Sequence, residues 1–157
     1  MAITKAQWEA VRAELWDSFS GSVEFVYQGH RISCQARLDH KRKLVIRVYL
    51  NGTIKGAWLL AVREPEKHPC SDPEVALVPL FWSVKRSALY SRKEQERLTK
   101  GFGKRQVKRL FPNLDAAVEM PTDTWGSATR MIAQFKRVEG LELVRIGYRN
   151  MAEVAGE

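Results

Sequence analysis

The chain has 157 residues, 45% of them hydrophobic, and a formal net charge of +8 at pH 7. This length and apolar content are typical of one domain with a sizeable core. No apolar run approaches the roughly 18 residues of a membrane span and the N-terminus lacks a secretory pattern, so we expect neither membrane insertion nor secretion. Two cysteines are too few for a disulfide framework and indicate a reducing, cytoplasmic compartment.

The first predicted element is an amphipathic helix that begins after Thr4. The pair Thr4 and Gln7 has the spacing of a capping box, and apolar residues from Trp8 to Leu15 recur at helical spacing. Residues 18–22 end this helix.

Three strands are predicted next. The first covers residues 23–27, and Gly29 with His30 turns the chain into the second. Alternation in the second strand places four apolar residues on one face: Ile32, Cys34, Ala36 and Leu38. After a polar turn over residues 39–43, residues 44–50 are rich in branched and aromatic side chains and form the third strand.

The pair Asn51 and Gly52 predicts a two-residue type I′ turn, because both positions need positive φ. Counting outward from this turn sets the register of a fourth strand: Leu50 opposite Thr53, Tyr49 opposite Ile54, and Val45 opposite Trp58. The sheet would then have one apolar face and one mixed face, the latter carrying Val45, Arg47, Tyr49, Ile54 and Trp58.

Helices dominate the prediction for the rest of the chain. After a proline-rich loop at residues 61–73, Pro73 begins a short helix that ends around residues 79–82. Ser91 and Glu94 have capping-box spacing and begin a longer helix.

The segment 101–103, with two glycines, interrupts this longer helix, and a short helix over 104–111 stops before Pro112. A helix is then predicted over 127–138, and Gly140 terminates it.

A final strand over 141–148 and a flexible tail over 151–157 complete the prediction. The fold class expected is α+β: an antiparallel sheet of about four or five strands with an N-terminal helix and several C-terminal helices. Residues 1–150 would form a single domain, with the loop 61–73 inside it.

The positive charge is concentrated in one 25-residue window, from Lys85 to Arg109. The window holds ten bases against two acids, while the rest of the chain has equal numbers of both. Clustered bases attract phosphates, so the window predicts a polyanion-binding surface, although charge runs are commonly only solvated helical surfaces. The candidate binding residues are Lys85, Arg86, Arg92, Lys93, Arg97, Lys100, Lys104, Arg105, Lys108 and Arg109.

Two predicted helices carry most of these bases. Steps of four, three and four place four of them on one side: Lys93, Arg97, Lys100 and Lys104. On the second helix, the basic residues lie on the side opposite an apolar stripe of Val107, Leu110 and Phe111. Apart from Gln106, that helix lacks the Asn, Gln, Ser or Thr residues usually mixed with Arg for base-edge contacts, so contact with the phosphate backbone fits better than a sequence-reading helix-turn-helix.

The mixed face of the sheet is a second candidate surface. Aromatic planes beside cations can hold single-stranded bases, and this face would supply them from Arg37, Arg47, Tyr49 and Trp58. The alternative is that a helix covers this face, because large apolar side chains are most often buried.

Residue types that bind zinc are present without the spacing of a zinc site: His30, Cys34, His68 and Cys70. Cys34 fits better as a small buried apolar residue. Asp39 and Asp72 lie near bases, as in metal-dependent nucleases, but a turn former and a helix cap are simpler roles for them. With no phosphate loop or nucleophile motif, we expect no catalytic residue, metal or cofactor.

Several segments resemble small accessory proteins of temperate phages and prophages. They are ITKAQWEAV, the hairpin VYLNGTIKGAWLL, and the later FGKRQVKRLFPNLD and EGLELVRIGY. That family has no assigned activity, and the resemblance implies only a context in the cytoplasm of a bacterial host. Such proteins often act by binding nucleic acid or host complexes, as anti-CRISPR inhibitors of host defence do.

The predicted function is therefore non-enzymatic binding of nucleic acid, or of a host nucleoprotein defence complex, through the basic helices. A protein-interaction module for an acidic patch on a host protein is the alternative, and a metal-dependent nuclease comes third. The sequence predicts no oligomeric state.

Overall fold

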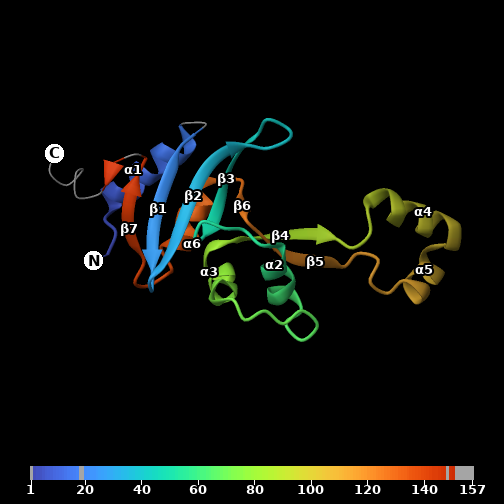
Figure 1. The fold of residues 1–157 in the computed structure, drawn as a ribbon. Coiled ribbons are helices and arrows are strands. Elements are labelled where there is room, and N and C mark those ends of the chain that lie inside the picture. The colour runs from blue at the N-terminus through green and yellow to red at the C-terminus, as the bar shows by residue number, and fades with distance from the viewer. Residues whose placement is uncertain (1, 18–19, 148, 151–157) are drawn as a thin grey trace. The chain divides into compact units, whose positions relative to one another are not determined.

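The computed structural model describes residues 2–17, 20–147 and 149–150, and the chain forms two compact units (Figure 1). Unit 1 takes the chain up to Ser83 and again from Pro121, and unit 2 takes residues 84–120. The loop 61–73 lies inside unit 1 and marks no boundary between units. A single domain over 1–150 remains a prediction.

Unit 1 begins with helix α1 (Lys5–Trp16), and its capping box is confirmed. The Gln7 backbone N–H donates to the Thr4 hydroxyl at 3.2 Å, and the Thr4 N–H donates to the Gln7 side chain at 2.9 Å. Two backbone N–H donors at the helix N-terminus are thereby satisfied reciprocally. The apolar face of α1 is buried at Trp8, Val11 and Leu15.

An antiparallel sheet forms the centre of unit 1. Its strands are ordered β6-β3-β2-β1-β7-β8, with β1 (Ser22–Tyr27), β2 (His30–Leu38), β3 (Leu44–Leu50) and β7 (Glu142–Ile146) as the longer members. The edges are the short β6 (Thr124–Trp125) and β8 (Arg149–Asn150). The α+β fold class is confirmed. Tyr148, at the end of the predicted final strand, and the predicted tail 151–157 lie outside the described residues.

The type I′ turn is confirmed, but the hairpin register predicted beyond it is wrong. Asn51 and Gly52 have φ of 53° and 78°, and Leu50 and Thr53 exchange two backbone hydrogen bonds. The chain then enters helix α2 (Gly56–Arg63), while β3 pairs along this edge with β6. Trp58 therefore leaves the sheet and becomes buried at 1% exposure, because the helix packs its large ring into the core.

The remaining helices of unit 1 follow their sequence signals closely. Pro73 begins the short helix η1 (Pro73–Leu77), which continues into α3 (Val78–Phe81). Helix α6 (Ala128–Phe135) begins after Ser127, whose hydroxyl accepts from the Arg130 N–H at 3.3 Å. It ends earlier than the predicted residue 138, since the chain turns toward Gly140 at φ +84°.

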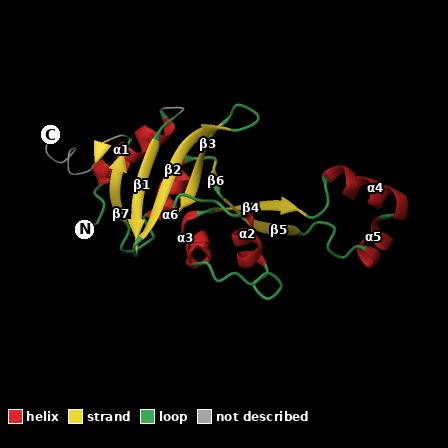
Figure 2. Ribbon diagram, viewed as in Figure 1, coloured by secondary structure: helices red, strands yellow, loops and turns green. Residues whose placement is uncertain are grey.

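The core of unit 1 lies between the sheet and the helices α1 and α6, which pack against each other (Figure 2). Phe135 of α6 sits edge-on to Phe25 of β1 and to Phe81 of α3, with ring centroids 5.4 and 5.1 Å apart. The predicted apolar face of β2 is buried at Ile32, Cys34 and Ala36. Leu38, at the strand end, is 47% exposed and departs from that prediction.

Unit 2 contains two helices and most of a two-stranded sheet of β4 (Ser83–Ala88) and β5 (Ala117–Thr122). The strands are not among the predicted elements, although Val118 and Met120 alternate with charged or small neighbours as a strand pattern does. The helices are α4 (Arg92–Phe102) and α5 (Lys104–Leu110), both as predicted. Within the described ranges, no helix is long and apolar enough to cross a bilayer.

Candidate nucleic-acid interface

Helix α4 is held at its start by a capping box and carries no buried residue. The Glu94 N–H donates to the Ser91 hydroxyl at 3.2 Å, and the Ser91 N–H donates to the Glu94 carboxylate at 3.3 Å. Because every side of α4 meets solvent to some degree, its charged residues need no burial. Local capping, rather than core packing, fixes where this helix begins.

Gly103 joins α4 to α5 and fixes the angle between them. Its φ of 79° and ψ of 156° lie in a region that residues with a Cβ essentially do not occupy. Its N–H donates to the Thr99 carbonyl at 2.8 Å, and its carbonyl accepts from Val107 at 2.9 Å. One residue therefore ends the first basic helix and begins the second.

Gly103→Ala is expected to destabilise the helix pair by about 1–3 kcal/mol, because alanine is strained at these angles. The space around Gly103 is open, so the effect comes from the backbone alone. The measurement is amide hydrogen exchange along α4 and α5. Gly101→Ala is the matched control: Gly101 lies within α4, where alanine is the better helix former, and protection should be unchanged or greater. Equal protection in the two variants would contradict the assigned role of Gly103.

A small aromatic cluster supports the two helices. Phe111 contacts Tyr90 edge-on, with centroids 6.1 Å apart, and packs against Phe102 at 6.0 Å. Of residues 84–120, all of which are described, only Val107 is fully buried. Leu110, the last residue of α5, is 51% exposed and departs from the predicted anchoring stripe. Unit 2 therefore has little core of its own.

All ten predicted binding residues are exposed. Strand β4 carries two of them, α4 four and α5 four: Lys85 and Arg86; Arg92, Lys93, Arg97 and Lys100; Lys104, Arg105, Lys108 and Arg109. Among the residues that the structure describes, Arg92 alone of the ten has an acid partner, Glu96 at 3.9 Å. We call these ten residues the basic surface. Its charge is almost entirely uncompensated within the described chain.

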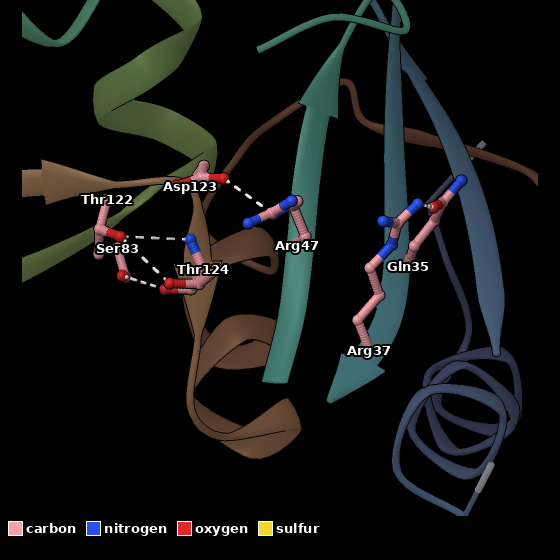
Figure 3. Close-up of polar contacts among 7 residues, drawn as sticks. All are labelled: Gln35, Arg37, Arg47, Ser83, Thr122, Asp123 and Thr124. Atoms are coloured by element: carbon pink, nitrogen blue, oxygen red, sulfur yellow. Dashed lines mark hydrogen bonds and ion pairs between the residues drawn. The ribbon is translucent and has the colours of Figure 1, made fainter. Parts of the chain in front are cut away.

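The second predicted surface differs in its composition and charge balance. Arg37 of β2 lies over the Tyr49 ring of β3, 5.8 Å from the ring centroid. It donates to Gln35 at 3.0 Å, and Figure 3 draws this hydrogen bond. Trp58 is not on this face, so its assignment there is wrong. No described side chain of the predicted mixed face on β2 and β3 is fully buried, so helix coverage of these strands is not observed.

Acids on or beside this face pair with all of its described arginines except Arg37. Arg47 pairs with Asp123 at 3.2 Å, as Figure 3 shows. Arg31 and Arg145 share Glu24 at 3.2 and 3.7 Å. Contacts with phosphate would therefore compete with existing ion pairs, and the sheet face is the weaker candidate.

The acids considered for nuclease chemistry have structural partners. The Asp39 carboxylate accepts the Lys41 and Lys43 N–H groups at 2.8 Å each, and the Lys43 hydrogen bond is the main cause of its lowered pKa. Asp39 is thus the predicted turn former.

Asp72 occupies the N-cap position of η1, as predicted, but its side chain makes no capping hydrogen bond. Its carboxylate accepts from the buried Trp58 indole at 2.9 Å, and this hydrogen bond is the main cause of its lowered pKa. The described residues bring together no group of three or more His, Cys, Asp or Glu side chains that could hold a metal. Cys34 is fully buried, and burial raises the pKa of its thiol.

Fold and surface together define an α+β protein whose second unit presents ten basic residues on a strand and two helices, nine of them without an acid partner among the described residues. Comparisons with known proteins found no matching family model, no matching curated protein and no matching solved structure. The functional argument therefore rests on the surface chemistry of this chain.

Proposed function

We propose that this protein binds nucleic acid through the basic surface, without catalysing a reaction. The observation that supports this most directly is that nine of its ten bases have no acid partner among the described residues. A cation already paired within the protein must give up that pair before it binds phosphate. Apart from Arg92, the basic residues of α4 and α5 are free of that cost.

The spacing of the basic residues favours contact with a phosphate backbone over the reading of nucleobases. Lys93, Arg97 and Lys100 lie on neighbouring turns of α4, and Lys104 and Lys108 lie one turn apart on α5. Flexible, exposed cations in rows neutralise phosphates whatever the sequence between them. The expected binding is therefore strong at low salt and nearly independent of sequence.

The resemblance to phage accessory proteins supplies a context for this proposal. In a bacterial host, the nucleic acid bound could be part of a nucleoprotein defence complex, as for anti-CRISPR-like inhibitors. The basic surface would then occupy the channel or groove in which that complex holds its own nucleic acid.

The proposal predicts a steep dependence of affinity on salt. If four bases meet phosphates, the logarithm of the association constant should fall with log salt at a slope of about −3.6. Between 50 and 200 mM NaCl, affinity for a labelled 20-base-pair duplex should then drop by about 150-fold. Fluorescence anisotropy measures this directly. Binding that is absent, or that does not change with salt, would contradict the proposal.

Affinity capture from a bacterial lysate, with and without nuclease, separates nucleic acid from an acidic protein patch. Partners lost after nuclease treatment support nucleic-acid binding. A partner retained after that treatment, together with no binding of purified duplex, favours the protein-interaction alternative.

A further inference from the structure

A pocket of about 440 Å³ opens within the basic surface of unit 2. Helix α5 forms one wall, Thr99 of α4 contributes to another, and the segment from Pro112 to Asp115 closes the rest. All the residues that line it belong to unit 2, so its shape depends on that unit alone.

The pocket combines an apolar floor with a cationic rim. Lys104, Val107, Lys108 and Phe111 stand at steps of three, one and three, which places them on one face of α5 and the turn after it. Val107 is buried and Phe111 is half-buried, while both lysines are exposed. An apolar cavity is thus bordered by three positive charges, with Lys104 and Lys108 one helical turn apart and Arg105 beside Lys104.

We propose that this pocket takes one unpaired nucleobase, with the flanking phosphates of a single strand on Lys104 and Lys108. The inference rests on the proposed function and names its preferred ligand: single-stranded nucleic acid. Binding a phosphate backbone requires cations but no apolar cavity. This pocket has cations and an apolar cavity. A base within a duplex is stacked and paired, and so cannot enter without being unstacked.

The chemistry of the residues that line the pocket suits a nucleobase. The ring of Phe111 offers an aromatic plane, on which any base can stack. The exposed carboxylate of Asp115 is an acceptor that suits the exocyclic amino group of cytosine. The volume lies within the usual range of small-ligand pockets, which a nucleobase does not exceed.

The test compares two single strands of equal charge. One is a 12-nucleotide oligodeoxycytidylate, and the other is a 12-unit abasic strand with the same phosphates and no bases. The wild-type protein is expected to bind the cytidylate at least about tenfold more tightly at the same salt, which is the scale of one base stacked on an aromatic side chain. Affinities are measured by fluorescence anisotropy.

Two variants locate the preference in the pocket. Phe111→Leu removes the aromatic plane but keeps an apolar group against Tyr90 and Phe102, and the preference should fall to about twofold. Thr99→Phe narrows the pocket without changing any basic residue of the basic surface, and the preference should again fall to about twofold. This second variant tests the pocket even if Phe111→Leu perturbs the fold. Circular dichroism checks the helices in both.

Lys93→Glu is the control for charge, because Lys93 lies on α4 and is not among the residues that line the pocket. It should lower the affinity for both strands equally and leave the tenfold preference in place. Equal wild-type binding of the two strands would overturn the pocket inference while the polyanion function stands. A preference that survives both pocket variants would also overturn it. No binding of either strand would overturn the proposed function itself.

Discussion

Reversal of four central charges in the basic surface is expected to lower the affinity for a 20-base-pair duplex by about 10³-fold at 0.15 M salt. The four substitutions are Arg97→Glu, Lys100→Glu, Lys104→Glu and Lys108→Glu. By counterion release, each phosphate contact contributes about a factor of five at this salt relative to 1 M, and four contacts multiply to about 10³. Titration by fluorescence anisotropy gives both the affinity and its salt slope, which should approach zero.

The fold should survive this change, because the four side chains are exposed and have no acid partner among the described residues. Glutamate in the last turns of α4 and α5 opposes the helix dipole, at a cost of about 0.3–1 kcal/mol each.

The matched control reverses four exposed bases of unit 1: Lys5, Lys43, Arg130 and Arg137. It changes the net charge equally and should weaken binding far less. If both quadruple variants lose affinity to the same extent, net charge and not this surface accounts for binding.

Phe135→Ala is expected to lower the free energy of unfolding by about 3–5 kcal/mol. Phe135 has no exposed surface and makes edge-on ring contacts with Phe25 of β1 and Phe81 of α3. Its removal leaves a cavity where the sheet, α3 and α6 meet, and the two rings beside it cannot collapse fully into that space. Urea denaturation monitored by tryptophan fluorescence measures the loss.

Phe102→Ala is the comparison in unit 2. Phe102 is 46% exposed and its one ring contact is with Phe111, so the loss should be near 1 kcal/mol. A loss below about 1.5 kcal/mol for Phe135→Ala would mean that the three-ring cluster does not dominate the core.

Elements with local signals could be predicted from the sequence. Two capping boxes placed the starts of α1 and α4 correctly, because the partners lie three residues apart and form whatever the rest of the chain does. Alternating apolar residues likewise predicted β2, and Gly103 marked the break between the basic helices. The basic surface was found in the same way, since exposed charge needs no distant partner to keep it exposed.

Features that depend on distant partners could not be predicted. The Asn51 and Gly52 turn formed, yet nothing local showed that the next strand beside β3 would be β6, which follows it by more than seventy residues. Trp58 was placed on the sheet for that reason. Its burial against Trp82 and its hydrogen bond to Asp72 depend on segments brought together by folding.

The amino-acid sequence thus settled the capped helices, the strand alternation and the charge of unit 2, because each depends on residues within a few positions of one another. Folding settled which arginines are free to act. Glu24 and Asp123 pair with Arg31, Arg145 and Arg47 of the sheet face across strands and turns, whereas the basic surface has one weak ion pair in the described chain. Folding also formed the pocket beside Phe111, because its walls come from two helices and a loop. The angle between the two helices is set at Gly103.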